Sequence, residues 1–129
     1  MRLLLDTHTL LWWIDLKLGT LSGPARDAIT QATGPVLVSS VSAFEIATKH
    51  AIGKLDGVEP LLAGFEQKLA NERFEPLPVE IRHAVAVGGL PLHHRDPFDR
   101  LLIAQALVED LTVVSIDDKF DRYGVRRLW

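Results

Sequence analysis

The sequence predicts a three-layer α/β fold whose central sheet is mostly parallel and has four to five strands. Three short, largely apolar runs lack the alternation of a half-exposed strand, which is typical of parallel strands covered on both faces. Each run is separated from the next by at least one segment of helical pattern, as parallel strands require. The runs are Leu3 to Leu5, Val36 to Val38 and Thr112 to Val114. With 129 residues, the chain has the length of one domain, residues 1–129, and is too short for two.

Helices are expected where apolar residues recur at helical spacing behind an N-cap residue or before a glycine or proline. These segments run from Thr7 or His8 to Ile14, from Ser22 to Ala32, from Ser40–Ser42 to Ala51, from Asp56 to Asn71, from Val79 to Val87 and from Asp96 to Leu107. Two prolines limit a further strand to a short piece near Phe74 to Leu77. A turn at Tyr123 and Gly124 precedes an expected last strand, Val125 to Trp129.

Composition restricts the chemistry that the chain can perform. Hydrophobic residues make up 47% and charged residues 24%, as in an ordinary soluble globular protein. No apolar run approaches the roughly 20 residues of a membrane span, and Asp6 interrupts the N-terminal apolar run, so we expect a cytoplasmic protein without a membrane partner. The absence of cysteine excludes disulfides, thiolate metal sites and cysteine nucleophiles.

A net charge of −3 is not typical of a protein that binds nucleic acid mainly by releasing counterions. RNA or DNA would have to be held by local basic patches or by a metal ion. Basic residues do cluster in three places: Lys49 to Lys54, His93 to Arg100, and Arg122 to Arg127. Taken alone, each cluster is more typical of a solvated face than of a binding patch.

Four acidic residues occupy corresponding places in the predicted fold. Asp6 and Asp117 follow buried strands, while Glu45 and Asp99 lie in early turns of helices that pack on the sheet. The carboxyl ends of parallel strands share one edge, so we expect the four carboxylates to converge there. Two like charges about 4 Å apart repel by roughly 4 kcal/mol at an effective dielectric near 20, so such a cluster needs protons or divalent cations. Oxygen ligands favour Mg²⁺ or Mn²⁺, which can activate a water for phosphodiester cleavage.

Each of these acids also has a purely structural explanation. Asp6 could cap the helix that follows it, and Ser42 with Glu45 forms a capping-box pattern in which the glutamate bonds back to the backbone. Asp96, which precedes Pro97, has the sequence signature of a helix N-cap. The functional interpretation therefore depends on the convergence of the acids in space.

The acidic segments resemble the motifs of a known family. Asp6 in LLLDTH, Glu45 in SSVSAFEIATK, Asp99 in HRDPFDRLLIAQA and Asp117 in VVSIDDKFDRYGVRRLW look like the four acidic motifs of PIN-domain ribonucleases, and more narrowly of VapC-type toxins. The resemblance covers essentially the whole chain. It implies a PIN-like α/β/α fold, Mg²⁺- or Mn²⁺-dependent cleavage of RNA, a homodimer, and inhibition by a cognate antitoxin.

By this resemblance, Asp6, Glu45 and Asp99 are the core metal ligands, and Asp117 completes the site directly or through water. Asp118 competes with Asp117 for that role, and Asp96 is first a helix cap and second a metal contact. Three further residues are candidates for supporting the site or contacting RNA: Ser115, Arg95 and Arg100. The two arginines are expected to pair with neighbouring acids, with phosphate contact as the second option.

Four aromatic residues have less definite roles. His93 and His94 could approach RNA phosphates, but local hydrogen bonding or solvent exposure is the plainer explanation. Trp12 and Trp13 are adjacent on a helix and are therefore not expected to face the same core. One of the two tryptophans is expected to anchor a dimer or antitoxin interface.

Three rival functions account for part of the sequence and differ in how well they fit it. The first is an RNA- or DNA-processing nuclease without an antitoxin. A receiver-like signalling module also places aspartates at strand ends, but it needs a second early acid and a late lysine at a strand end, which do not fit this chain. A catalytically inactive binding domain is disfavoured because all four acidic positions are filled. An aspartyl phosphatase is excluded because His8 stands where its second aspartate would be.

Overall fold

The computed structural model describes residues 1–14 and 19–129. Within these residues the chain forms one five-stranded sheet in which every pairing is parallel, and the strand order is β3-β2-β1-β4-β5. The strands are β1 (Leu3–Leu5), β2 (Val36–Ser39), β3 (Glu75–Leu77), β4 (Thr112–Val114) and β5 (Arg126–Leu128). The three-layer α/β prediction is confirmed, and the sheet is parallel throughout.

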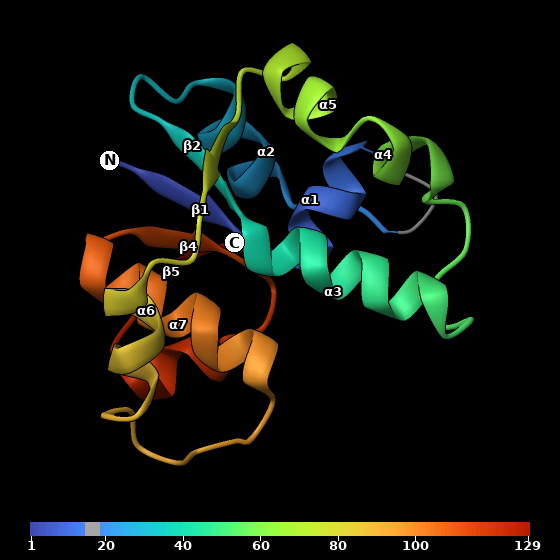
Figure 1. The fold of residues 1–129 in the computed structure, drawn as a ribbon. Helices are drawn as coiled ribbons and strands as arrows, with labels where there is room; N and C mark the ends of the chain where they lie inside the picture. The colour runs from blue at the N-terminus through green and yellow to red at the C-terminus, as the bar shows by residue number, and fades with distance from the viewer. Residues whose placement is uncertain (15–18) are drawn as a thin grey trace.

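Helices cover both faces of this sheet (Figure 1). They are α1 (Thr7–Ile14), α2 (Gly23–Thr30), α3 (Ser40–Ala51), α4 (Glu59–Ala63), α5 (Phe65–Asn71), α6 (Ile81–Val87), α7 (Pro97–Glu109) and the 3₁₀ helix η2 (Asp118–Tyr123). Side chains alternate along β1: Leu3 and Leu5 enter a core cluster with residues of α1 to α5, whereas Leu4 enters a second cluster with residues of α7 and η2. Two separate cores therefore hold the layers together.

β1 lies in the middle of the sheet and is completely buried. Its neighbours are β2 and β4, so the chain crosses to opposite sides of β1 after its first two strands. In open parallel sheets, ligands bind at such a switch point, beside the carboxyl ends of the strands. Asp6 follows β1 directly at this edge.

The segment from Asp56 to Asn71 differs from the single weak helix that its pattern predicts. It forms two short helices, α4 and α5, which meet at Gly64. The backbone of Gly64 has φ −140° and ψ 45°, which is outside the helical region, and this breaks the helix.

The prediction that Trp12 and Trp13 face different surroundings is wrong in one respect. Both side chains are half-buried, and both pack against the same core cluster. They reach it from different sides of α1, because the Trp12 ring contacts Trp129 whereas the Trp13 ring contacts Phe74. Within residues 1–14 and 19–129, no helix is long and apolar enough to cross a membrane.

Candidate active site

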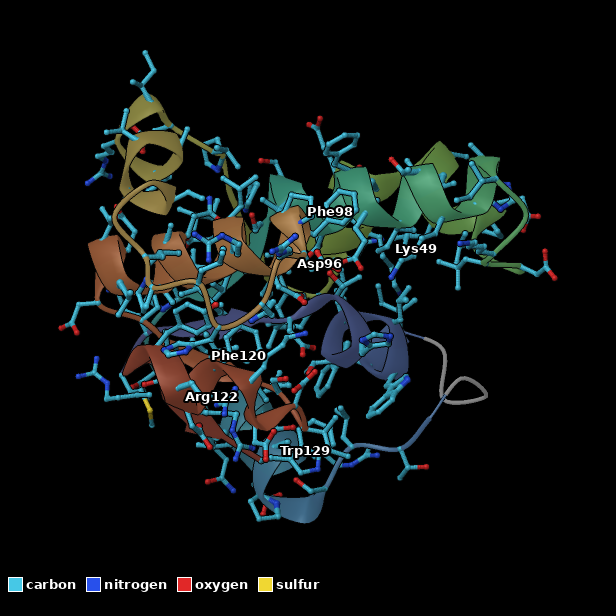
Figure 2. All side chains as sticks on the ribbon, turned by 90° about the horizontal axis from the view of Figure 1, so that it is seen from below. Lys49, Asp96, Phe98, Phe120, Arg122 and Trp129 are labelled. Atoms are coloured by element: carbon cyan, nitrogen blue, oxygen red, sulfur yellow. The ribbon has the colours of Figure 1, made fainter. Side chains whose placement is uncertain are left out.

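One polar cavity of about 180 Å³ opens at the carboxyl edge of the sheet. Three segments that lie far apart in the sequence supply four of its carboxylates: Asp6, Glu45, Asp96 and Asp99. We call this cavity the acidic pocket, and its other lining residues are Thr7, His8, Lys49, Leu102 and Lys119. Figure 2 shows Asp96 at the start of α7 and Lys49 on α3, and both residues line the pocket.

Asp6 is buried and held at both carboxylate oxygens. Its Oδ1 accepts a hydrogen bond from the backbone N–H of Thr9 at 2.8 Å, so Asp6 does cap α1. Its Oδ2 accepts from the hydroxyl of Ser115, which follows β4. Ser115 is itself fully buried and accepts from the backbone N–H of Asp117 at 3.0 Å. Capping and site formation are therefore compatible, because the cap uses one oxygen and leaves the carboxylate fixed at the pocket wall.

Glu45 is a buried carboxylate in the middle of α3, with 6% of its surface exposed. The helix is capped by Ser39, so the predicted capping box between Ser42 and Glu45 does not form. The hydroxyl of Thr7 donates to Glu45 Oε1 at 2.7 Å, and Lys49 Nζ pairs with Oε2 at 2.6 Å. A buried carboxylate is costly without partners, and these two contacts supply partners to both oxygens of Glu45.

The ammonium of Lys119 bridges two of the predicted site residues. Its Nζ lies 2.9 Å from Asp99 Oδ1 and 3.1 Å from Asp117 Oδ2. Asp99 also faces His94, whose Nε2 lies 3.7 Å from Asp99 Oδ2. Asp117 caps η2 by accepting from the backbone N–H of Lys119 at 2.9 Å, and 45% of its side chain is exposed. Lys119 thus supplies a positive charge where the sequence predicts a divalent cation.

The two aspartates that share Lys119 have pKa values shifted in opposite directions. Burial is the largest influence on Asp99 and raises its pKa, and the contact with Lys119 offsets only part of that effect. Burial also acts to raise the pKa of Asp117, but hydrogen bonds from the backbone and ammonium of Lys119 outweigh it and lower the pKa. Burial would lower the pKa of Lys119, yet its bonds to the two carboxylates raise it.

We therefore expect Asp99 to titrate above, and Asp117 below, the ordinary aspartate pKa of 3.8. A ¹³C NMR titration of the side-chain carboxyls would measure both values. Replacing Lys119 with methionine should raise both pKa values, because each carboxylate loses a neighbouring cation. Titration of Asp99 below Asp117 would contradict this account of the site.

The donor set of the pocket suits a hard divalent cation, because its carboxylates offer oxygen ligands. Across the part of the chain that the structure describes, however, no three acidic or histidine side chains are close enough together to hold an ion as they stand. The residues fit Mg²⁺ or Mn²⁺ by chemistry and by their shared cavity. Binding would require the carboxylates to close in, and Asp99 to exchange Lys119 for the ion.

The remaining candidates among the acids lie at the border of the site. Asp96 caps α7, with Oδ1 accepting from the backbone N–H groups of Phe98 at 2.9 Å and Asp99 at 3.1 Å, and it also lines the acidic pocket. Asp117 does not line the pocket but is linked to it through Ser115 and Lys119. Asp118 is exposed. Of these two neighbours, Asp117 has the contacts expected of a fourth site residue.

The basic residues around Pro97 support a loop. Arg95 is exposed. The expectation that Arg100 pairs with an acid is wrong: its guanidinium donates to the backbone carbonyls of Val87, Leu90, Pro91 and His94. Five donors in a rigid fork let one arginine satisfy several carbonyls of an irregular loop. Arg100 therefore fixes the segment that leads into α7 and its carboxylates.

His93 and His94 both pack against Tyr123. The ring of His93 lies edge-on to Tyr123 at 4.9 Å, and His94 Nδ1 lies 3.1 Å from the tyrosine hydroxyl. That hydroxyl also accepts from the backbone N–H of His94 at 3.1 Å. Local hydrogen bonding, the plainer of the two explanations, describes His94.

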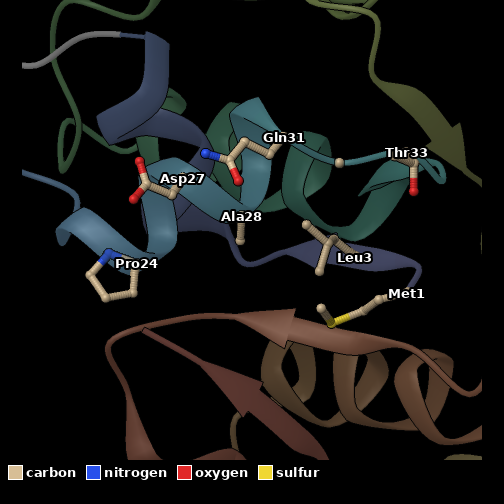
Figure 3. A pocket seen from close by; sticks show the side chains of 8 residues that line it. Met1, Leu3, Pro24, Asp27, Ala28, Gln31 and Thr33 are labelled. Atoms are coloured by element: carbon tan, nitrogen blue, oxygen red, sulfur yellow. The ribbon is translucent and has the colours of Figure 1, made fainter.

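A second cavity of about 450 Å³ lies near the N-terminus (Figure 3). Asp27 is the carboxylate in its lining, which otherwise comes from Met1, Leu3, Pro24, Ala28, Gln31, Ala32 and Thr33. A lone carboxylate does not make a cation site. The acidic chemistry is concentrated in the smaller acidic pocket.

Sequence reasoning missed three residues of the acidic pocket that contact its carboxylates. Lys49 was detectable, because a lysine four residues after a glutamate on a helix pairs with it. Thr7 and Lys119 had no such signal, since their contacts with Glu45 and Asp99 join segments that lie far apart in the sequence.

Comparisons with known proteins agree with this architecture. In a crystal structure of VapBC2 from Rickettsia felis bound to promoter DNA, one chain matches with a TM-score of 0.72 and 17% identity, over 98% of this chain and 97% of that chain. DNA-bound VapBC from Salmonella typhimurium also matches with a TM-score of 0.72, at 21% identity, over 98% and 96%. VapBC-1 from nontypeable Haemophilus influenzae matches with a TM-score of 0.67 and 16% identity, over 98% of this chain and 96% of that chain. At these identities the matches establish a shared fold.

A search of the curated proteins found no significant match. The model of the PIN domain family, in contrast, matches residues 3–126, which is nearly the whole chain and includes all four predicted acidic residues. This confirms the family resemblance of the acidic segments. The chain belongs to the PIN domain family.

Proposed function

We propose that this protein is a divalent-cation-dependent endoribonuclease, with residues 1–129 acting as one catalytic domain. PIN domains are nucleases, and the whole chain follows that fold. The observation that carries the proposal is the convergence of Asp6, Glu45 and Asp99 on one cavity of about 180 Å³ at the carboxyl edge of the sheet. Three buried or half-buried carboxylates in one pocket are costly unless a cation joins them.

Asp6, Glu45 and Asp99 would hold the ion, and Asp117 would act on it directly or through water. A bound Mg²⁺ or Mn²⁺ supplies a water of lowered pKa and neutralises charge on the phosphodiester. The chain itself orients the ligands: Ser115 fixes Asp6, and Thr7 fixes Glu45. By family resemblance, the products would carry 3′-hydroxyl and 5′-phosphate ends.

The proposal is tested by incubating the protein with single-stranded RNA and Mn²⁺ or Mg²⁺, with and without excess chelator. Cleavage that requires the ion and stops with chelator supports it. Cleavage that persists in chelator would exclude the metal-dependent mechanism. A matched single-stranded DNA substrate distinguishes ribonuclease from general nuclease activity.

The position of Lys119 leads to a prediction about the affinity for metal ions. Its ammonium lies beside Asp99 and Asp117, so a divalent ion held by Asp99 would compete with it. We expect Lys119→Met to increase the affinity for Mn²⁺ several-fold in isothermal titration calorimetry. Lys68→Met, which removes a similar ion pair with Glu72 on α5, is the matched control and should leave the affinity unchanged. Weaker Mn²⁺ binding by Lys119→Met would show that the ammonium does not compete.

We further propose that the enzyme is the toxin of a toxin–antitoxin pair and forms a homodimer. The shared fold with chains of VapBC complexes supports the antitoxin partner. An apolar strip on α6 supports a protein interface, because Ile81 and Val85 lie one turn apart and are 83% and 71% exposed. A small gene immediately upstream that encodes a DNA-binding protein would separate a toxin from a processing nuclease. Membership in the PIN family removes the receiver-like alternative.

A further inference from the structure

A third cavity adjoins the acidic pocket on the side of α1 and α3. Its volume is about 370 Å³, and it shares Thr7, His8 and Lys49 with the acidic pocket. We call it the Trp12 pocket, and its other lining residues are Leu11, Trp12, Ile46, Lys54 and Leu55. Because three residues line both cavities, a single extended ligand can occupy both of them.

The lining of the Trp12 pocket combines an apolar floor with a cationic rim. Leu11 and Ile46 are buried core residues, so the floor is apolar and fixed. The rim carries Lys49, whose ammonium reaches Glu45, and the exposed Lys54. Apolar walls with a few placed polar groups are typical of small-ligand sites, and about 370 Å³ lies near the lower end of their usual size.

The indole of Trp12 is packed against several neighbouring groups. The ring of Trp129 contacts it edge-on at 5.7 Å, and His8 lies at 6.1 Å. The backbone of Gly19 approaches so closely that a Cβ there would lie 2.3 Å from Trp12 Cε2. A larger residue at position 19 would displace the indole. The ring therefore offers the pocket a preorganised aromatic surface with little freedom left to lose on binding.

We propose that the Trp12 pocket binds one nucleobase of the RNA next to the phosphodiester that is cleaved in the acidic pocket. The base stacks on the indole of Trp12, and Lys54 contacts the adjoining phosphate. Stacking on aromatic residues beside a basic track is how proteins hold single-stranded nucleic acid without reading its sequence. The inference rests on the nuclease function proposed above, because that function places the scissile phosphate at the shared wall.

Charge favours a nucleotide over a basic peptide as the occupant. The acidic pocket would attract a basic side chain, but Lys49 and Lys54 on the rim of the Trp12 pocket would repel one. They attract the phosphates on either side of a base. This basic track is local, which agrees with a chain whose net charge is −3.

The test measures binding without metal, so that it does not depend on cleavage. Adenosine 5′-monophosphate is titrated into the 129-residue protein, and the three indole N–H signals, from Trp12, Trp13 and Trp129, are followed by NMR. The Trp12 signal should shift with saturation, while the Trp13 signal on the other side of α1 should not. A short single-stranded RNA is then titrated by fluorescence anisotropy. Trp12→Leu should weaken its binding by about tenfold or more.

Three further variants keep the result interpretable. Trp12→Phe should restore most of the affinity because it keeps an aromatic face, whereas Trp13→Leu is the matched control and should bind RNA normally. Lys54→Ala removes an exposed side chain, so it tests the rim without a risk to folding, and it should weaken RNA binding several-fold at low salt. Lys68→Ala on α5 is its control.

The assignment of the pocket is overturned if the Trp12 indole N–H signal does not shift with either ligand. It is also overturned if Trp12→Leu and Lys54→Ala both bind RNA normally. Metal-dependent cleavage by the wild type, together with these negative results, would leave the proposed function standing and remove only this inference. Conversely, base stacking on Trp12 without any metal-dependent cleavage would support the pocket and count against the nuclease.

Discussion

Asp6→Asn is expected to lower the rate of metal-dependent RNA cleavage by at least about 10²- to 10³-fold. The neutral amide cannot supply the anionic ligand, and charge stabilisation by a catalytic metal is worth several kcal/mol. The fold should survive, because the asparagine Oδ1 can still accept from the backbone N–H of Thr9 and its amide can donate to the Ser115 hydroxyl. Cleavage is measured by gel electrophoresis of a labelled RNA, and folding by circular dichroism and the thermal midpoint.

Asp27→Asn is the matched control, since Asp27 is an exposed carboxylate that lines the cavity near the N-terminus. It should cut RNA at the wild-type rate. An Asp6→Asn variant that folds and retains full activity would rule out Asp6 as a ligand. A variant that fails to fold would instead show that its bonds to Thr9 and Ser115 stabilise the protein more than they serve the site, and Asp99→Asn then becomes the decisive substitution.

Phe120→Ala should lower the free energy of unfolding by about 3–5 kcal/mol, as is usual when a large aromatic side chain is deleted from a core. Phe120 is completely buried in the core cluster that also contains Val113 and Tyr123. It follows Lys119 directly and anchors η2, whose start carries Asp117. We therefore expect losses of both stability and RNA cleavage, with stability measured by urea denaturation.

Phe44→Ala provides the comparison for this substitution. Phe44 is 62% exposed and contacts the ring of Phe98 edge-on at 5.3 Å, so its removal should cost about 1 kcal/mol or less. Equal losses for the two phenylalanines would show that burial at Phe120 does not dominate the stability of this region.

The fold was predictable because its signals are local. Short, largely apolar runs identified β1, β2 and β4, and the Asp96-Pro97 pair identified the start of α7. The break at Gly64 was missed, because a glycine within a helical pattern does not by itself show whether the helix continues or ends there. The 3₁₀ geometry of η2 was also beyond the sequence, because so short a segment does not show from its residues whether it forms a turn or a 3₁₀ helix.

The candidate site was predictable only in part. Counting residues along strands and helices brought Asp6, Glu45 and Asp99 to one edge, and the structure places all three in one pocket. The position of Lys119 between Asp99 and Asp117 depends on how η2 packs, for which the sequence has no periodic signal. For the same reason, Arg100 was expected to pair with acids, although the irregular loop before α7 offers it four carbonyls.

The bond between Asp6 and Ser115 spans 109 positions in the chain. β1 also pairs with β4, so this strand is enclosed only when a segment more than a hundred residues further along the chain has docked beside it. Long-range pairings of this kind form late in folding. A partly folded molecule therefore contains Asp6 but no assembled acidic pocket.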